Sequence, residues 1–200
     1  MAVYAELQVT SNFTFLRGAS HPHELVATAA ALGQQAIAIT DHNSLAGVVR
    51  AHTTAKSLDI KLLIGARLDF TDGPSLLCLP TNHAAYSGLA TLLTHGKRRT
   101  TKGQCQLCYA DLIEYHTDQI LIFLPPEKMD PAFVDRLKNL NQRMLGQCYL
   151  AANNNYRSNG LYNIIRSAEI ADLARVPLVA TNDVQYHIPE RRVLQDILTC

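Results

Sequence analysis

The sequence predicts a parallel α/β barrel, and three features of the chain support that prediction. Short apolar runs alternate with segments of helical length along the 200 residues. Several runs are apolar throughout, which is typical of parallel strands covered on both faces. Polar residues follow these runs, as they do at the carboxyl ends of barrel strands. Six or seven strand–helix units in tandem therefore favour a barrel over a sandwich.

The first elements are expected within residues 6–44. Loosely alternating apolar residues predict a strand over 6–15. A helix is expected over 21–33, with Ser20 as its N-cap, a proline in its first turn and a glycine at its end. The almost wholly apolar run 36–40 predicts a buried strand, and it leads directly into the polar residues 41–44.

The same alternation continues to the end of the chain. Strands are expected over 61–65 with a continuation to 70, and over 75–79, 119–124, 147–152 and 177–181. Helices are expected over 45–58, 84–94, 110–115, 131–140, 162–174 and 189–198. The basic, glycine-bounded stretch 96–103 is expected to be a loop. A solvated charge run is the favoured interpretation of this loop, and contact with nucleic acid or another domain is the alternative.

Composition narrows the function classes. With 48% hydrophobic residues the chain can bury a substantial core, and its length favours a single domain over 1–200. The net charge of +1 and the charged fraction of 18% provide no overall field that would attract a phosphate backbone. No apolar run approaches the roughly 18 residues of a membrane span, and no signal peptide is evident, so a cytoplasmic location without membrane contact is expected.

The five scattered cysteines indicate reduced thiols rather than a disulfide framework. Cys105 and Cys108 have the spacing of a zinc or redox pair. Because a single pair at this spacing is weak evidence for a site, ordinary thiols are the favoured interpretation.

Four ordered stretches carry a family resemblance: 4–20, 38–47, 63–67, and 179–187 with 189–192 and 194–196. In this order they resemble PHP domains of bacterial DNA polymerase III alpha subunits, most closely the error-prone, damage-induced ImuC-type paralogue. The resemblance implies a PHP-type (β/α)7-like parallel barrel at the N-terminus of a translesion DNA-directed DNA polymerase. The abrupt stop at residue 200 is interpreted as a truncation within that longer chain.

The resemblance also implies a metal site, in which His, Asp and Glu residues bind up to three ions and hydrolyse phosphoesters. Four of the matching ligand positions hold other side chains: Gln8, Thr10, Arg67 and Gln185. The first two replace paired histidines, and Gln185 replaces the histidine of an Asp-x-His pair. Arg67 replaces an acidic ligand and would repel a cation. Three vestigial candidates for metal ligands remain: Asp41, His42 and Asp183.

Losing several ligands while gaining a guanidinium should abolish a multinuclear site. We therefore expect no phosphodiesterase or proofreading activity, no catalytic residue and no bound cofactor in this fragment. Asp41 is interpreted as a cap of the following helix and His42 as a hydrogen-bonding group at the barrel mouth. A residual mononuclear Zn²⁺ or Mn²⁺ site is the alternative. Mg²⁺ is implied only for the parent polymerase.

Three functions are compatible with these patterns. The first is a domain that supports the palm and thumb of its own polymerase, which would contact primer-template DNA through the parent chain. The second is a free-standing metal-dependent phosphoesterase, against which the replaced ligands argue. The third is an interaction module for a sliding clamp or translesion accessory proteins. A supporting domain should expose an apolar patch when it is separated from the polymerase body.

Overall fold

The computed structural model describes residues 4–144, 147–154 and 160–200. The backbone packs into two compact units. Unit 1 comprises Met1–Ala66 and Asn182–Cys200, and unit 2 comprises Arg67–Thr181. Both units combine helices with strands that pair mainly in parallel, as the sequence predicted.

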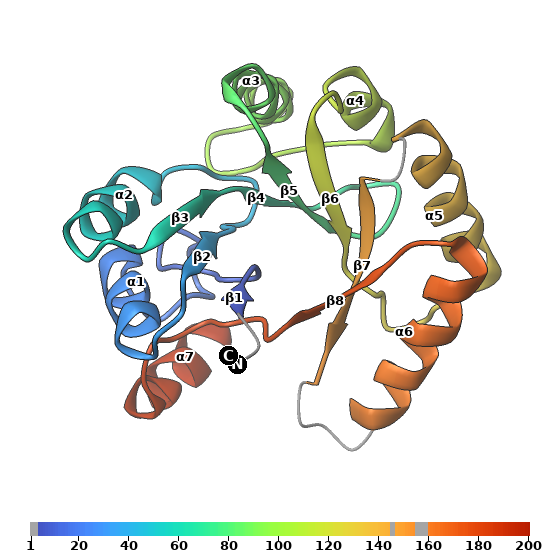
Figure 1. The fold of residues 1–200 in the computed structure, drawn as a ribbon. Helices are drawn as coiled ribbons and strands as arrows, with labels where there is room; N and C mark the ends of the chain where they lie inside the picture. Colours follow the sequence, from blue (N-terminus) through green and yellow to red (C-terminus); the bar gives the residue numbers. More distant parts are fainter. Residues whose placement is uncertain (1–3, 145–146, 155–159) are drawn as a thin grey trace. The chain divides into compact units, whose positions relative to one another are not determined.

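Unit 1 is built on a parallel sheet in the order β1-β2-β3. Its strands are β1 (Ala5–Glu6), β2 (Ala36–Ile39) and β3 (Lys61–Ile64). Its helices are α1 (Pro22–Ala31), α2 (Val48–Ser57), the 3-10 turn η1 (Pro189–Arg191) and α7 (Arg192–Thr199). Helices α1 and α2 lie side by side against β2 and β3 (Figure 1).

The core of unit 1 lies between this sheet and the two helices α1 and α2. Its buried members are aliphatic side chains: Val9, Leu25, Val26, Ala29, Ile37, Ile39, Ala51, Ala55 and Ile60. Burying a side chain of the size of leucine or isoleucine contributes about 1.5–3 kcal/mol, so these residues are the main source of stability in unit 1. The prediction of a buried strand at 36–40 is confirmed, because three of the four residues of β2 are buried.

Two predictions about the beginning of the chain are wrong. The expected strand over 6–15 is reduced to the two residues of β1 and an isolated parallel bridge between Val9 and Val184. The chain turns after Thr10, where the Thr14 amide donates to the Ser11 carbonyl. Ser20 is not the N-cap of α1; that residue is His21, and the Ser20 hydroxyl lies 2.7 Å from His187 Nδ1 instead.

Unit 2 contains the sheet β4-β5-β6-β7-β8, with β4 beginning at the boundary between the units. Its strands are β4 (Ala66–Leu68), β5 (Leu76–Pro80), β6 (Gln119–Phe123), β7 (Cys148–Asn153) and β8 (Leu178–Thr181). Its helices are α3 (His83–Arg98), α4 (Tyr109–Glu114), α5 (Pro131–Arg143) and α6 (Gly160–Ala174). Helix α6 packs against β7 and α5 (Figure 1).

The expectation of a wholly parallel barrel is wrong for the pair β5 and β6. Strands β5 and β6 are antiparallel, whereas β6–β7 and β7–β8 are parallel. Two helices, α3 and α4, lie between β5 and β6 in the chain. One crossover helix carries the chain back across the sheet, so that the next strand runs parallel to the last. A second helix returns the chain to the end of the sheet where β5 finishes, so β6 can run antiparallel to β5.

The basic stretch 96–103 is also organised differently from the prediction. Helix α3 continues through Gly96 to Arg98. Gly96 is a packing residue, because a Cβ there would lie 2.5 Å from Leu107 Cδ2 and 2.7 Å from Cys105 Sγ. The Arg99 guanidinium makes two hydrogen bonds to the Asp111 carboxylate, which hold the pKa of Asp111 well below its usual range. Arg99 is therefore an ion-pair partner and not part of a freely solvated charge run.

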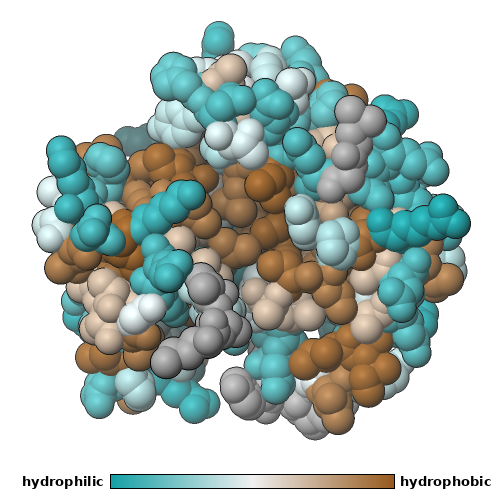
Figure 2. Space-filling model, in the orientation of Figure 1, coloured by the Kyte–Doolittle hydropathy of each residue, from teal (hydrophilic) through white to brown (hydrophobic). Residues whose placement is uncertain are grey.

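Several large apolar side chains are exposed in both units. On α6 they include Leu161, Tyr162 and Ile165, and apolar atoms are visible over the lower end of this helix in Figure 2. None of the helices in the described part of the chain is long and apolar enough to cross a membrane.

Candidate functional site

Unit 1 brings together three segments that carry the sequence-predicted site residues. The Thr10 amide donates to the Val184 carbonyl at 2.8 Å, and the Val184 amide donates to the Gln8 carbonyl at 2.9 Å. On the other side of Val9, the Thr40 amide donates to the Val9 carbonyl at 2.9 Å. The segments that carry residues 8–10, 41–42 and 183 therefore lie next to one another within unit 1.

Asp183 is bound by two glutamine side chains. Gln8 Nε2 donates to Asp183 Oδ1 at 2.8 Å, and Gln185 Nε2 lies 3.5 Å from Asp183 Oδ2. Asp183 has a positive φ of 50°, a conformation that aspartate tolerates better than most residues. Each carboxylate oxygen of Asp183 therefore faces an amide N–H donor, and both amides come from positions where the family resemblance would place a histidine.

Asp41 is buried and anchors the loop that follows β1. Its Oδ1 accepts from the Ser11 amide at 2.8 Å and from the Thr14 hydroxyl at 2.7 Å, and its Oδ2 accepts from the Ser11 hydroxyl at 2.8 Å. Burial raises the pKa of Asp41, and the hydrogen bonds from Thr14 and Ser11 oppose that shift. Asp41 does not cap α2, whose N-cap residue is Gly47.

The raised pKa of Asp41 predicts a pH-dependent effect of Asp41→Asn. A carboxyl whose pKa is higher in the folded state stabilises that state most at pH values below its ordinary pKa, and this contribution is lost as pH rises through the folded-state pKa. The free energy of unfolding of the variant, measured relative to the unsubstituted chain, should therefore increase between pH 4 and pH 7. Urea unfolding at a series of pH values measures this difference. A difference that stays constant or decreases would show that burial does not dominate at Asp41.

The remaining candidates have structural contacts of their own. His42 is half-buried, and its backbone amide donates to the Thr14 hydroxyl at 3.0 Å. Thr10 is buried beside the Val9–Val184 bridge. Arg67 belongs to unit 2, where its Nε lies 2.8 Å from Asp69 Oδ1 in an ion pair. Arg67 is therefore bound to an acidic neighbour within its own unit.

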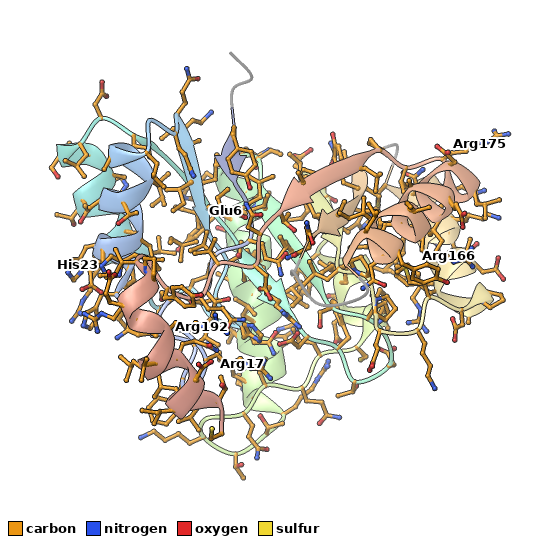
Figure 3. All side chains as sticks on the ribbon, turned by 90° about the horizontal axis from the view of Figure 1, so that it is seen from below. Glu6, Arg17, His23, Arg166, Arg175 and Arg192 are labelled. Atoms are coloured by element: carbon orange, nitrogen blue, oxygen red, sulfur yellow. The ribbon has the colours of Figure 1, made fainter. Side chains whose placement is uncertain are left out.

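Glu6 is a further buried residue of unit 1, and its sequence pattern did not mark it as functional. Its side chain is only 3% exposed, and it projects from β1 (Figure 3). Oε1 accepts from the backbone amides of Gln8 and Asn182 at 2.9 and 3.2 Å. Oε2 accepts from the Tyr4 hydroxyl at 2.6 Å and from Asn182 Nδ2 at 3.0 Å. Burial and the bond to Glu6 raise the pKa of Tyr4. The sequence offered one signal for this role, because Glu6 is the only acidic residue in the strand predicted over 6–15.

The cysteine pair lies in unit 2 and does not form a metal cluster with other ligands in the described residues. Cys108 is the N-cap residue of α4, and its thiol lies 3.1 Å from Asp111 Oδ2. The hydrogen bond to Asp111 raises the pKa of Cys108, and burial raises that of Cys105. Both shifts disfavour the thiolate form, which is the one that binds metals and reacts.

The donor set of unit 1 does not suit a multinuclear metal centre. Across residues 4–144, 147–154 and 160–200, no three His, Cys, Asp or Glu side chains are placed to hold one ion together. The oxygens of Asp41 and Asp183 instead accept N–H and O–H donors. A metal ion would have to displace these donors, and the replacing amides offer one neutral oxygen each in place of an imidazole nitrogen.

Comparisons with known proteins agree with this architecture. The profile of the PHP domain matches residues 6–172. The chain is 49% identical over 199 residues to an error-prone DNA polymerase of Caulobacter vibrioides and 45% identical over 197 residues to error-prone DNA polymerase 2 of Agrobacterium fabrum. These matches cover 99% and 98% of this chain but only 18% of each relative.

A solved structure shares the fold at low sequence identity. It is an amidohydrolase from Chromobacterium violaceum with bound sulfate and no metal. The similarity has a TM-score of 0.66 at 17% identity and covers 91% of this chain and 87% of that one. At this identity the likeness concerns the fold alone, and it supports the PHP-type architecture predicted from the sequence.

Proposed function

Because the chain belongs to the PHP domain family, we propose that it is the supporting PHP domain of an error-prone DNA-directed DNA polymerase and that its own metal site is vestigial. Relatives that are 44–49% identical over nearly the whole chain carry the name of that polymerase. The chain spans less than a fifth of their length. Nucleotidyl transfer and the Mg²⁺ ions it needs are therefore assigned to the remainder of such a chain, and no catalytic residue is assigned here.

The observation that supports a vestigial site best is the 2.8 Å hydrogen bond from Gln8 Nε2 to Asp183 Oδ1. An amide nitrogen has no lone pair for a metal ion, and its N–H satisfies the carboxylate oxygen that an ion would otherwise bind. Ser11 and Thr14 satisfy Asp41 in the same way. Hydrogen bonds, in place of a metal ion, thus hold the strand ends together.

The proposed context includes several partners. The palm and thumb of the same polypeptide would pack against this domain, and primer-template DNA would be bound through them. A sliding clamp and translesion accessory proteins are further partners of the whole polymerase, in the cytoplasm. The alternative of a free-standing phosphoesterase is not favoured, because its site would require ligands at Gln8, Thr10 and Gln185.

The test uses the full-length protein in two assays. We expect it to extend a primed DNA template in Mg²⁺ and to hydrolyse bis-p-nitrophenyl phosphate in Mn²⁺ no faster than the buffer. Asp183→Asn should leave that hydrolysis rate at the buffer value. Absence of primer extension would contradict the polymerase assignment, and hydrolysis that Asp183→Asn abolishes would contradict the vestigial site.

A further inference from the structure

Helix α7 presents an apolar face that the described residues do not cover. Val193, Leu194 and Ile197 occupy one side of the helix, and the first and last of these are 68% and 67% exposed. No residue of α7 is buried. An isolated helix of eight residues is not stable in water, so such a helix depends on tertiary contacts. We call these three residues the α7 face.

Polar contacts link α7 to the former ligand positions. Gln195 Nε2 donates to Gln185 Oε1 at 2.6 Å, and Gln185 lies against Asp183, which Gln8 binds from the other side. Immediately before α7, Arg191 Nη2 donates to Glu24 Oε1 at 3.1 Å. Figure 3 shows Arg192 on the same helix. These bonds fix the position of α7 without burying its apolar face.

We propose that α7 is a docking helix whose α7 face packs against the part of the same polypeptide that follows residue 200. In this arrangement the former metal-ligand positions act through Gln195 to hold α7 in place. The proposal rests on the proposed function, because it requires the longer polymerase chain. It assigns a role to Gln185 and Gln195 that is distinct from metal binding.

The length of the relatives supports this occupant. The matched polymerases are more than five times as long as the chain, so a large continuation of the same polypeptide is available to cover α7. A covalent tether gives that continuation an effective concentration in the millimolar range, at which a small contact suffices. A second copy fits less well, because three side chains fall far short of the roughly 800 Å² per partner that a stable interface buries.

The test is hydrogen–deuterium exchange on the full-length polymerase. In the unsubstituted protein the amides of α7 should be protected, and Val193→Ser combined with Ile197→Ser should accelerate their exchange about tenfold or more. Val49→Ser is the matched control, since Val49 is a 74% exposed valine on α2. It should leave α7 unchanged. Gln195→Ala should accelerate exchange in α7 while leaving β2 unaffected, as a positioning role requires.

Two outcomes would overturn the proposal. One is that the α7 amides of the unsubstituted full-length protein exchange as fast as those of an unstructured peptide. This measurement does not depend on whether any variant folds. The other is protection that rises with protein concentration, which would indicate a second copy. Primer extension is measured on the same samples: its absence would refute the polymerase assignment, whereas the exchange data alone decide whether α7 is covered.

Discussion

Gly18→Ala is expected to destabilise the chain by about 3 kcal/mol or more, at the upper end of the range for overpacking. A Cβ at residue 18 would lie 2.1 Å from the Ser11 carbonyl oxygen and 2.8 Å from that of Thr10. Both atoms belong to the backbone, so no side-chain rotation can relieve the clash. The loop would have to open, and the Ser11 and Thr14 bonds to Asp41 would be weakened with it.

Urea unfolding followed by circular dichroism measures this effect, and Gly88→Ala is the matched control. Gly88 lies within α3, where a new Cβ would meet no atom closer than 3.7 Å. Alanine in a helix interior is favoured over glycine by about 0.5–1 kcal/mol, so the control should be neutral or stabilising. Equal unfolding free energies for the two variants would show that the loop does not have the described conformation.

Glu6→Ala is expected to cost about 3–5 kcal/mol, because it removes four hydrogen bonds from one buried carboxylate. The amides of Gln8 and Asn182 cannot rotate to find other acceptors, so both would lose their partner. At roughly 2–4 °C of Tm per kcal/mol in a chain of this size, the melting temperature should fall by about 6–20 °C.

Two further variants separate the hydrogen bonds from the general loss of a carboxylate. Glu6→Gln keeps one oxygen acceptor and should cost less than Glu6→Ala. Glu190→Ala removes an exposed carboxylate from the same unit and should change the unfolding free energy by less than about 0.5 kcal/mol. If Glu6→Ala behaved like Glu190→Ala in thermal unfolding, the Glu6 hydrogen bonds would not stabilise the fold.

Elements whose pattern is decided by burial could be predicted from the sequence. The helix expected at 162–174 is α6, and the strand expected at 36–40 is β2. In both, apolar spacing reflects the face that packs on the rest of the unit. The strand expected at 6–15 was wrong because its alternation includes Phe13 and Phe15, which lie in the loop that Asp41 holds.

The sequence indicates which residues belong to the candidate site, but not which hydrogen bonds their side chains make. Polar residues that follow parallel strands are expected at one edge of a sheet, and in unit 1 the segments carrying residues 8–10, 41 and 183 do lie side by side. The donors that satisfy Asp183 and Asp41 depend on side-chain rotamers and loop geometry, which the sequence pattern does not encode. The link between Gln195 and Gln185 likewise joins residues whose separation along the chain matches no recognised motif.

Titration calorimetry with Mn²⁺ measures whether hydrogen bonds occupy the place of the metal ions in unit 1. Mn²⁺ is preferred to Zn²⁺ because it favours oxygen ligands such as the carboxylates of Asp41 and Asp183 over thiols. We predict no stoichiometric binding up to millimolar Mn²⁺, with the same result for Asp183→Asn. Binding of one or more ions per chain that Asp183→Asn abolishes would contradict the claim and identify a working metal centre.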